Sequence, residues 1–219
     1  GLVKIGTNPI LYHIIKLFKY YGYNRFIICT GYKQKENKSY FYKNKNNKLF
    51  KDLKIEIFYT GLKSNTGLRI KKVKKKIKNI FFLTYCDGLI DLNLKLLLNI
   101  FLKKDKIGLM TVTNPQSRFG IVSLDKNKNI FDFNEKKIIK DLWVNAGFYI
   151  FKKEIFNFIK GKNPIFESEV LKVMASQKKM FAYQHSGFWK CMDTIKDKLE
   201  LDRLWKKNKA PWDFDEKIL

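Results

Sequence analysis

Histidine and cysteine are scarce in this chain, with two of the first and three of the second among 219 residues. The three cysteines, Cys29, Cys86 and Cys191, stand far apart, and each lies in or beside an apolar segment. An odd, scattered set of this kind argues against a disulfide framework and against a zinc site, and favours a reducing, cytoplasmic setting. We expect His13 and His185 to be structural, and no Ser-His-Asp or Cys-His constellation is visible.

Long apolar runs are missing as well. A membrane-spanning helix needs roughly 20 predominantly apolar residues in succession, and no stretch of the chain approaches that length. The most apolar helical candidate, Ile90–Leu102, is interrupted by Asp91, Asn93, Lys95 and Asn99. No secretory leader pattern is visible either. The sequence therefore predicts no membrane partner.

Arginine is the third scarce residue, although the formal net charge is +25. Arginine occurs only at Arg25, Arg69, Arg118 and Arg203, so lysine carries nearly all the positive charge. Lysine is abundant together with Asn, Ile, Phe and Tyr, whose codons are also AT-rich, and base composition alone would produce this pattern. Proteins that read nucleic acid usually use arginine for bidentate contacts. We therefore expect no nucleic-acid partner, and we give Arg69 and Arg118, which lie within glycine motifs, more weight as site residues.

The composition is that of a folded protein, with 45% hydrophobic and 16% aromatic residues. A chain of this length predicts one domain, residues 1–219. In the first half, helical and strand patterns alternate, and Asn8-Pro9 should begin the first helix with Asn8 as its N-cap. The expected elements of that half are a helix ending at Gly22, strands over Arg25–Thr30 and Ile55–Tyr59, a polar helix between them, and a basic helix over Gly67–Ile77.

Strand patterns dominate the second half. The predicted strands are Ile107–Thr113, Gly120–Leu124, Ile130–Phe133, Trp143–Phe151 and Met180–His185, and the predicted helices are Glu167–Ser176 and Ile195–Lys206. Strands that alternate with helices indicate a mostly parallel sheet with crossover connections. The fold class that follows is α/β, with a mixed sheet flanked by helices.

The run Phe81–Gly88 is the most informative stretch of the chain. Its apolar and aromatic residues read as a strand buried on both faces, and the strand stops at Asp87-Gly88. Ligands of open α/β sheets bind at the carboxyl ends of the strands, where a carboxylate holds a divalent metal beside phosphate. The alternative is an Asp-Gly turn that caps the next helix.

Five further segments join this strand in a fixed order: Thr60–Arg69, Ser117–Gly120, Trp143–Phe148, Gly187–Thr194 and Lys209–Trp212. Together they closely resemble the sugar-phosphate nucleotidyltransferases, and the last two segments point to the cytidylyl branch. The resemblance implies a Rossmann-like mixed sheet. It also implies that CTP and α-D-glucose 1-phosphate are joined to give CDP-glucose and pyrophosphate, in a homo-oligomer that serves nucleotide-sugar and lipopolysaccharide O-antigen synthesis.

On this resemblance Asp87 and Asp193 are catalytic residues and the ligands of a Mg²⁺ ion. The alternative for Asp193 is helix capping. Thr194 and Asp197 form a capping pattern of their own, which leaves Asp193 available for a ligand.

The resemblance also implies two groups of substrate contacts. The nucleotide-binding residues are Ser64, Thr66, Gly67, Arg69 and Cys86, and the residues on the sugar-phosphate side are Arg118, Glu135, Lys136, Asn145 and Gly147. The alternative for Thr66 is a helix cap, and that for Lys136 is a solvated charge. Family members have glycine where Leu68 and Cys86 stand here, and a side chain at Cys86 would crowd the nucleotide.

Members of the family open with a strand and a glycine-rich loop around the triphosphate, followed by a lysine. Gly1–Gly6 corresponds to the segment just after that lysine. We therefore expect the first strand of the sheet to be missing and the 219 residues alone to be inactive. The alternatives are a related enzyme that uses dTTP or UTP, a non-catalytic nucleotide-sugar-binding domain of the same fold, and a basic nucleic-acid-binding module.

Overall fold

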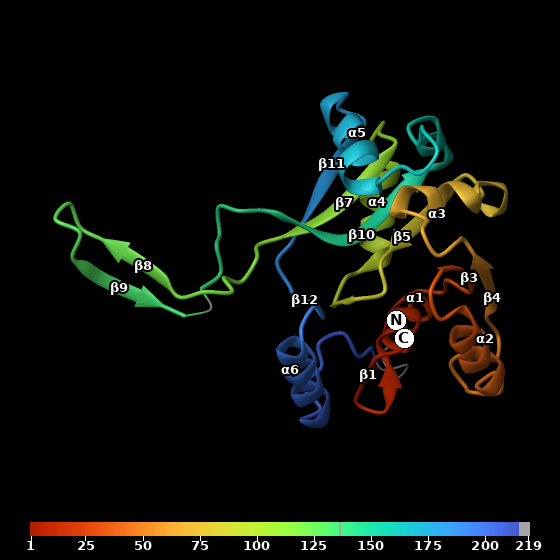
Figure 1. The fold of residues 1–219 in the computed structure, drawn as a ribbon, viewed down its shortest axis with the longest axis horizontal. Coiled ribbons are helices and arrows are strands. Elements are labelled where there is room, and N and C mark those ends of the chain that lie inside the picture. Colours follow the sequence, from red (N-terminus) through yellow and green to blue (C-terminus); the bar gives the residue numbers. More distant parts are fainter. Residues whose placement is uncertain (136, 215–219) are drawn as a thin grey trace.

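A four-stranded mixed sheet forms the centre of the molecule in the computed structural model, which describes residues 1–135 and 137–214 (Figure 1). Its strands stand in the order β11-β7-β10-β5. They are β5 (Ile80–Thr84), β7 (Gly108–Thr113), β10 (Val144–Lys152) and β11 (Met180–His185). Strand β10 runs antiparallel to both of its neighbours, whereas β11 and β7 are parallel. The predicted mixed sheet is thus confirmed.

Two more strands, β3 (Arg25–Thr30) and β4 (Lys54–Tyr59), form a parallel pair of their own at one side of the molecule. Both strands have the predicted positions to within one residue. Among the described strands β3 pairs only with β4, and β5 pairs only with β10. The edges of β3 and β5 are therefore not joined by backbone hydrogen bonds to one another.

Helices cover both faces of the sheet (Figure 1). They are α1 (Ile10–Tyr20), α2 (Gln34–Lys43), α3 (Thr66–Lys72), α4 (Leu94–Leu102), the π-helical turn η3 (Phe166–Leu171) that leads into α5 (Lys172–Ser176), and α6 (Ile195–Lys206). Short 3₁₀ turns occupy Lys74–Lys76 (η1) and Lys153–Asn157 (η2). No helix in the described part of the chain is long and apolar enough to cross a membrane.

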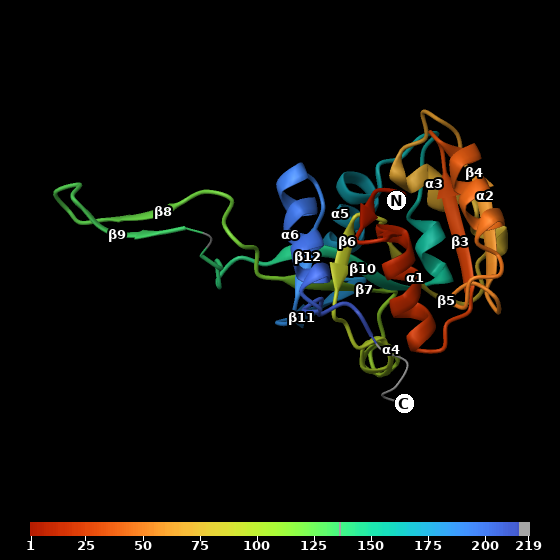
Figure 2. The same cartoon turned by 90° about the horizontal axis from the view of Figure 1, so that it is seen from below.

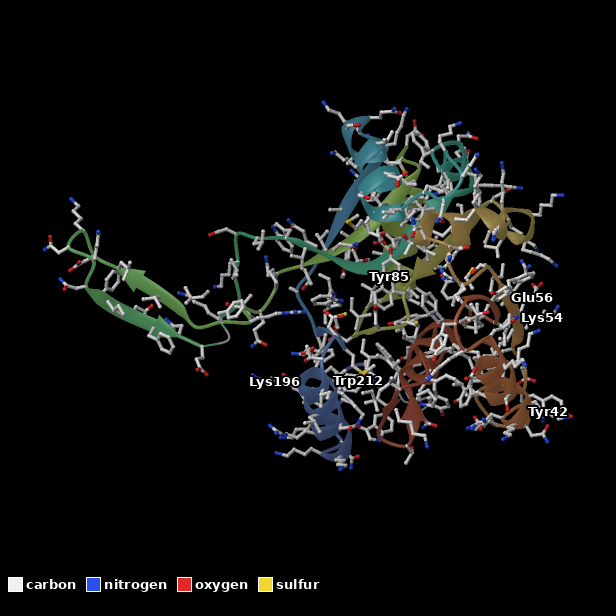
Figure 3. The ribbon with its side chains drawn as sticks, viewed as in Figure 1. Tyr42, Lys54, Glu56, Tyr85, Lys196 and Trp212 are labelled. Carbon is white, nitrogen blue, oxygen red and sulfur yellow. The ribbon has the colours of Figure 1, made fainter. Side chains whose placement is uncertain are left out.

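Strand β10 separates two hydrophobic cores because successive side chains of a strand point to opposite faces. Phe148 and Ile150 are buried in a core shared with α1, α4 and α6. Tyr149 and Phe151 are buried in the other, with residues of α3, η2, η3 and α5. A third cluster lies between α1, α2 and the β3–β4 pair. The buried Trp212 belongs to the first core and lies beside α6 (Figure 3).

Three local predictions were wrong. Asn8 does not cap α1: Asn8-Pro9 forms the two-residue strand β2, which pairs with β1 (Lys4–Ile5), and Pro9 precedes the helix without a side-chain cap. The strand before Asp87 is half-buried instead of buried on both faces, because β5 lies at the edge of the four-stranded sheet. The basic helix ends at Lys72, well before Ile77.

A ribbon of two antiparallel strands projects from the body between β7 and β10 (Figures 1 and 2). It consists of β8 (Ile121–Leu124) and β9 (Ile130–Asn134), which pair only with each other among the described strands. We call residues 117–135 the arm. The sequence predicted both strands, and the structure adds that they leave the globular part of the molecule.

Candidate active site

Two carboxylates meet at the end of β5. Asp87 follows β5 and precedes the short strand β6 (Gly88–Ile90), which pairs antiparallel with β12 (Trp189–Cys191). The amide of Met192 donates a hydrogen bond of 2.7 Å to the carbonyl of Asp87. This pairing brings the segment before α6 to the end of β5. One ligand atom from each of Asp87, Cys191 and Asp193 lies within 4.8 Å of the others.

The electrostatics of this cluster suit a cation. Burial raises the pKa of the Asp87 carboxyl above its ordinary value, and repulsion from Asp193 raises it further. Two ionised carboxylates this close repel each other unless a cation lies between them. Their oxygen atoms are the ligands that hard divalent ions such as Mg²⁺ prefer. The donor set therefore fits the metal that the sequence predicts.

Cys191 is a member of the cluster that sequence reasoning missed. Its Sγ donates to Asp193 Oδ1 at 3.1 Å. Burial, together with the hydrogen bond to Asp193, raises the pKa of the thiol to about 12. The thiol is therefore protonated at neutral pH. Only the pairing of β12 with β6 places it beside Asp87, and no local pattern signals so short a strand.

Asp193 is free of any helix-capping role. Thr194 caps α6 through a capping box with Asp197, as the sequence predicts. The second oxygen of Asp193 instead accepts a hydrogen bond of 2.8 Å from Arg118 Nη2, at the base of the arm. Both side chains of this ion pair are exposed. The structure thus brings Arg118 to Asp193 of the carboxylate pair, and its contact with the sugar phosphate stays a prediction.

The predicted nucleotide loop lies at the ends of β3 and β4. Arg69 Nη1 donates a hydrogen bond of 2.8 Å to Thr60 Oγ1. The guanidinium also packs against Gly31, where a Cβ would lie 2.8 Å from Arg69 Nη2. Ser64 is held locally, through a hydrogen bond from its hydroxyl to the carbonyl of Thr60. The lack of a side chain at Gly67 has a packing reason, because a Cβ there would lie 2.8 Å from the carbonyl oxygen of Pro164.

Thr66 does not cap α3, so its helix-cap alternative was wrong. The N-cap is Asn65, whose side chain makes no capping bond. The Thr66 hydroxyl donates a hydrogen bond of 2.9 Å to Glu167 Oε2 and accepts one of 2.9 Å from the backbone amide of Phe166. The other oxygen of Glu167 accepts a hydrogen bond from the Tyr85 hydroxyl. Glu167 therefore joins the nucleotide loop to the end of β5, where Figure 3 shows Tyr85.

The chain of polar contacts continues to the sugar side. Tyr149 is buried beside Tyr85, with ring centroids 6.2 Å apart, and its hydroxyl accepts a hydrogen bond from the Asn145 amide. Asn145 Oδ1 in turn accepts a hydrogen bond of 2.9 Å from the backbone amide of Gly147, which has a φ of 77°. Sequence reasoning missed Tyr85, Tyr149 and Glu167. Their contacts span long sequence separations, so no spacing rule would have found them.

The other predicted residues are less tightly grouped. Cys86 is exposed next to Asp87, and a Cβ on Gly1 would lie 3.3 Å from its Sγ. Glu135 is exposed and directly follows β9 on the arm, away from Asn145 in the body of the sheet. Lys136 lies outside the described residues.

Both histidines are packed within the fold. His13 Nε2 contacts the carbonyl of Ile5 at 3.0 Å, and His185 Nε2 lies 2.9 Å from Asp91 Oδ1. Burial lowers the pKa of His13. Both positions agree with the structural role that we expected.

Comparison with known proteins identifies the class. Residues 1–206 match the nucleotidyl transferase family, and the chain belongs to that family. It is 33% identical to the glucose-1-phosphate cytidylyltransferase of Salmonella typhi over 230 aligned residues, which cover 96% of this chain and 89% of the relative. Identity to a probable glucose-1-phosphate cytidylyltransferase of Bacillus subtilis is 34% at the same coverage.

The fold agrees with this membership. A solved structure of apo-UDP-glucose pyrophosphorylase superposes with a TM-score of 0.71 at 18% identity, and the match covers 95% of this chain and 90% of that one. The resemblance to sugar-phosphate nucleotidyltransferases that the motifs indicated is confirmed.

Proposed function

We propose that this protein makes CDP-glucose and pyrophosphate from CTP and α-D-glucose 1-phosphate. The observation that carries the proposal is the meeting of Asp87 and Asp193 at the end of β5, in a chain 33% identical to a glucose-1-phosphate cytidylyltransferase. In this reaction a phosphate oxygen of the sugar phosphate attacks the α-phosphorus of CTP. The bond to the β-phosphate oxygen breaks, and pyrophosphate leaves with the electron pair.

Asp87 and Asp193 are the residues that would hold Mg²⁺ in this proposal. The ion supplies charge neutralisation to the phosphates when it is bound. The carboxylates orient it at the end of β5, and relief of the repulsion between them favours its binding. No covalent nucleophile is needed, since phosphoryl chemistry of this kind depends on positioning and electrostatic stabilisation.

Nucleotide binding is assigned to Ser64, Thr66, Gly67, Arg69 and Cys86. The N-terminal end of α3 presents backbone N–H groups, and such groups suit polar or anionic ligand atoms. Arg69 lies between the ends of β3 and β4 and adds a positive charge there. The contacts of Thr66 with Glu167 and with the Phe166 amide hold this loop in place.

Sugar-phosphate binding is assigned to Arg118, Glu135, Lys136, Asn145 and Gly147. Arg118 is already at the carboxylate pair, and its guanidinium matches phosphate geometry. Asn145 and Gly147 lie in the irregular part of β10, where its pairing with β7 shifts register, and their amide and carbonyl groups suit sugar hydroxyls. The proposed setting is the cytoplasm, as part of nucleotide-sugar supply for lipopolysaccharide O-antigen, with the protein acting as a homo-oligomer.

A nucleotide panel tests the proposal. CTP, dTTP and UTP are each offered with glucose 1-phosphate and Mg²⁺, and pyrophosphate release and the sugar nucleotide are measured. We use residues 1–219 and also a loop fusion, in which the family's glycine-rich loop segment precedes Gly1. A pocket that hydrogen-bonds the base edge rejects a wrong base strongly, so CTP should be preferred on the order of a hundredfold or more. Comparable rates with all three nucleotides would contradict the cytidylyl assignment.

A further inference from the structure

A short ladder carries the carboxylate cluster at one of its ends. Strands β6 and β12 have three residues each and pair only with each other among the described strands. Asp87 directly precedes β6, and Asp193 closely follows β12. The amide of Met192 extends the pairing through its hydrogen bond of 2.7 Å to the carbonyl of Asp87. A two-stranded ladder is marginally stable by itself, so other contacts must hold this one on the central sheet.

A second polar pair, Asp91 and His185, lies at the opposite end of the ladder. The amide of Asp91 donates a hydrogen bond of 3.2 Å to the carbonyl of Phe188. Oδ1 of Asp91 is buried, and a buried carboxylate oxygen needs a polar neighbour. His185 supplies it, because its Nε2 lies 2.9 Å from Asp91 Oδ1 and 3.2 Å from the carbonyl oxygen of Phe188. Both of these oxygens are acceptors, so Nε2 carries a proton that it shares between them.

His185 is fixed to the central sheet. It is the last residue of β11, is buried, and pairs with Thr113 at the end of β7. The turn from β11 to β12 fits closely around the polar pair at Gly187. A Cβ on Gly187 would lie 2.4 Å from Asp91 Oδ1 and 2.9 Å from His185 Cε1. The pair therefore joins the end of the ladder to the sheet, and the turn leaves it no room to move.

Asp91 acts on the carboxylate cluster from a distance. It follows Asp87 by four positions along an extended segment. A strand rises about 3.3 Å per residue, so Asp91 lies roughly 13 Å from Asp87 and does not ligate the same ion. The ladder between them determines where Asp193 stands relative to Asp87. Displacing a ligand by about 1 Å can cost on the order of a hundredfold in rate, so the hold on the ladder matters for the chemistry.

We propose that Asp91 and His185 are positioning residues, which hold the β6–β12 ladder on the central sheet. Through the ladder they set the separation of Asp87 and Asp193 for a divalent cation. The inference rests on the proposed function in taking those two carboxylates as the metal ligands. The hold on the ladder is a property of the chain itself, so it can be measured without any turnover.

Hydrogen exchange on the metal-free 219-residue chain tests the hold on the ladder. In Asp91→Ala, His185→Leu and Gly187→Ala the Met192 amide should exchange about tenfold faster, while the amides of β7 and β10 keep their protection. Asp91→Asn retains a side-chain oxygen for His185 Nε2 and should stay close to the wild type. The matched control is His13→Leu, which removes the other buried histidine, outside the ladder, and should leave the Met192 amide unchanged.

Calorimetry with Mg²⁺ on the same chains tests the effect on the site. The dissociation constant should rise about tenfold or more in Asp91→Ala and His185→Leu, and should stay at the wild-type value in Asp91→Asn and His13→Leu. In the loop fusion, Asp91→Ala and His185→Leu should need correspondingly more Mg²⁺ for half-maximal turnover.

Unchanged exchange of the Met192 amide in both Asp91→Ala and His185→Leu would overturn the proposal. Faster exchange with an unchanged affinity for Mg²⁺ would overturn it as well, because the pair would then be structural alone. A loop fusion that joins no nucleotide to glucose 1-phosphate would instead contradict the proposed function, and the exchange and calorimetry would still decide the role of the pair.

Discussion

Arg118 and Asp193 form an ion pair of 2.8 Å that joins the base of the arm to the carboxylate cluster. The two residues are far apart in the sequence, and the contact crosses from the segment after β7 to the segment before α6. One oxygen of Asp193 is thus occupied by Arg118 and the other by the thiol of Cys191. A metal held by Asp193 would share these oxygens with Arg118 and Cys191 or replace one of the two contacts.

Replacing Arg118 should affect sugar-phosphate binding much more than stability. The pair is exposed, and exposed ion pairs contribute about 0–1 kcal/mol. In the loop fusion, Arg118→Ala should therefore leave the melting temperature nearly unchanged and raise the KM for glucose 1-phosphate about tenfold or more, since it removes a charge-assisted contact to phosphate. The KM of Arg118→Lys should lie between those of the wild type and Arg118→Ala, because lysine keeps the charge but lacks the paired donors of the guanidinium. An unchanged KM in both variants would remove Arg118 from the site.

Asp87→Asn should stabilise the metal-free protein at pH 7. Burial and then the charge of Asp193 raise the pKa of Asp87, so its ionised form is disfavoured in the folded state. A raised carboxyl pKa means that the folded state loses stability as the pH rises from the ordinary carboxyl pKa to the raised one, and the loss persists above it. The melting temperature of Asp87→Asn in EDTA should exceed that of the wild type at pH 7. This difference should shrink as the pH is lowered towards the ordinary carboxyl pKa. A lower melting temperature at pH 7 would contradict the electrostatic account.

Tyr85→Phe should weaken the connection between the nucleotide loop and β5. The Tyr85 hydroxyl donates to Glu167, which also accepts from Thr66. Loss of one such bond costs about 1 kcal/mol of unfolding free energy, measured by urea denaturation. In the loop fusion the KM for CTP should rise, because Glu167, which accepts the hydrogen bond from Thr66, is no longer held by Tyr85. Tyr42→Phe is the control: Tyr42 is 73% exposed, lies far from the site in Figure 3, and should change neither quantity.

The thiols should react in a defined order with iodoacetamide. Burial raises the pKa of Cys29 to about 11 and that of Cys191 to about 12, so both hold almost no thiolate at pH 8. Cys86 is exposed and should be modified first, as mapped by mass spectrometry. CTP should protect it if the nucleotide lies over this position. Cys86→Gly should then lower the KM for CTP, whereas faster labelling of Cys191 than of Cys86 would argue against this geometry.

Much of the fold follows from the sequence, because periodicity and turn residues determine where elements lie. The strands β3 and β11 and the helix α6 have the predicted bounds. The prediction that Asn8 caps the first helix was wrong because Asn8 pairs with Ile5 in a two-residue antiparallel ladder. No local sequence pattern shows such a ladder. Cys191 in the carboxylate cluster and Glu167 beside the nucleotide loop were missed for the same physical reason: contacts between residues far apart in the sequence, rather than local propensity, place them.

The outward course of the arm was equally invisible in the sequence. Alternation along Ile121–Leu124 predicts a strand, but it does not say which layer will cover the apolar face. Which layer covers a strand depends on the packing of the whole molecule. The uncovered face of the arm therefore becomes visible only in the three-dimensional structure.

Pyrophosphate release by Asp87→Asn and Asp193→Asn in the loop fusion tests the central claim most directly. Each substitution is nearly isosteric and removes one charged oxygen ligand, so turnover with CTP and glucose 1-phosphate should fall on the order of a hundredfold or more. Circular dichroism should remain that of the parent, and binding of Mg²⁺ by calorimetry should weaken in both variants. Near-parental turnover in either variant, with the fold intact, would contradict the assignment of that carboxylate to the metal and to the reaction.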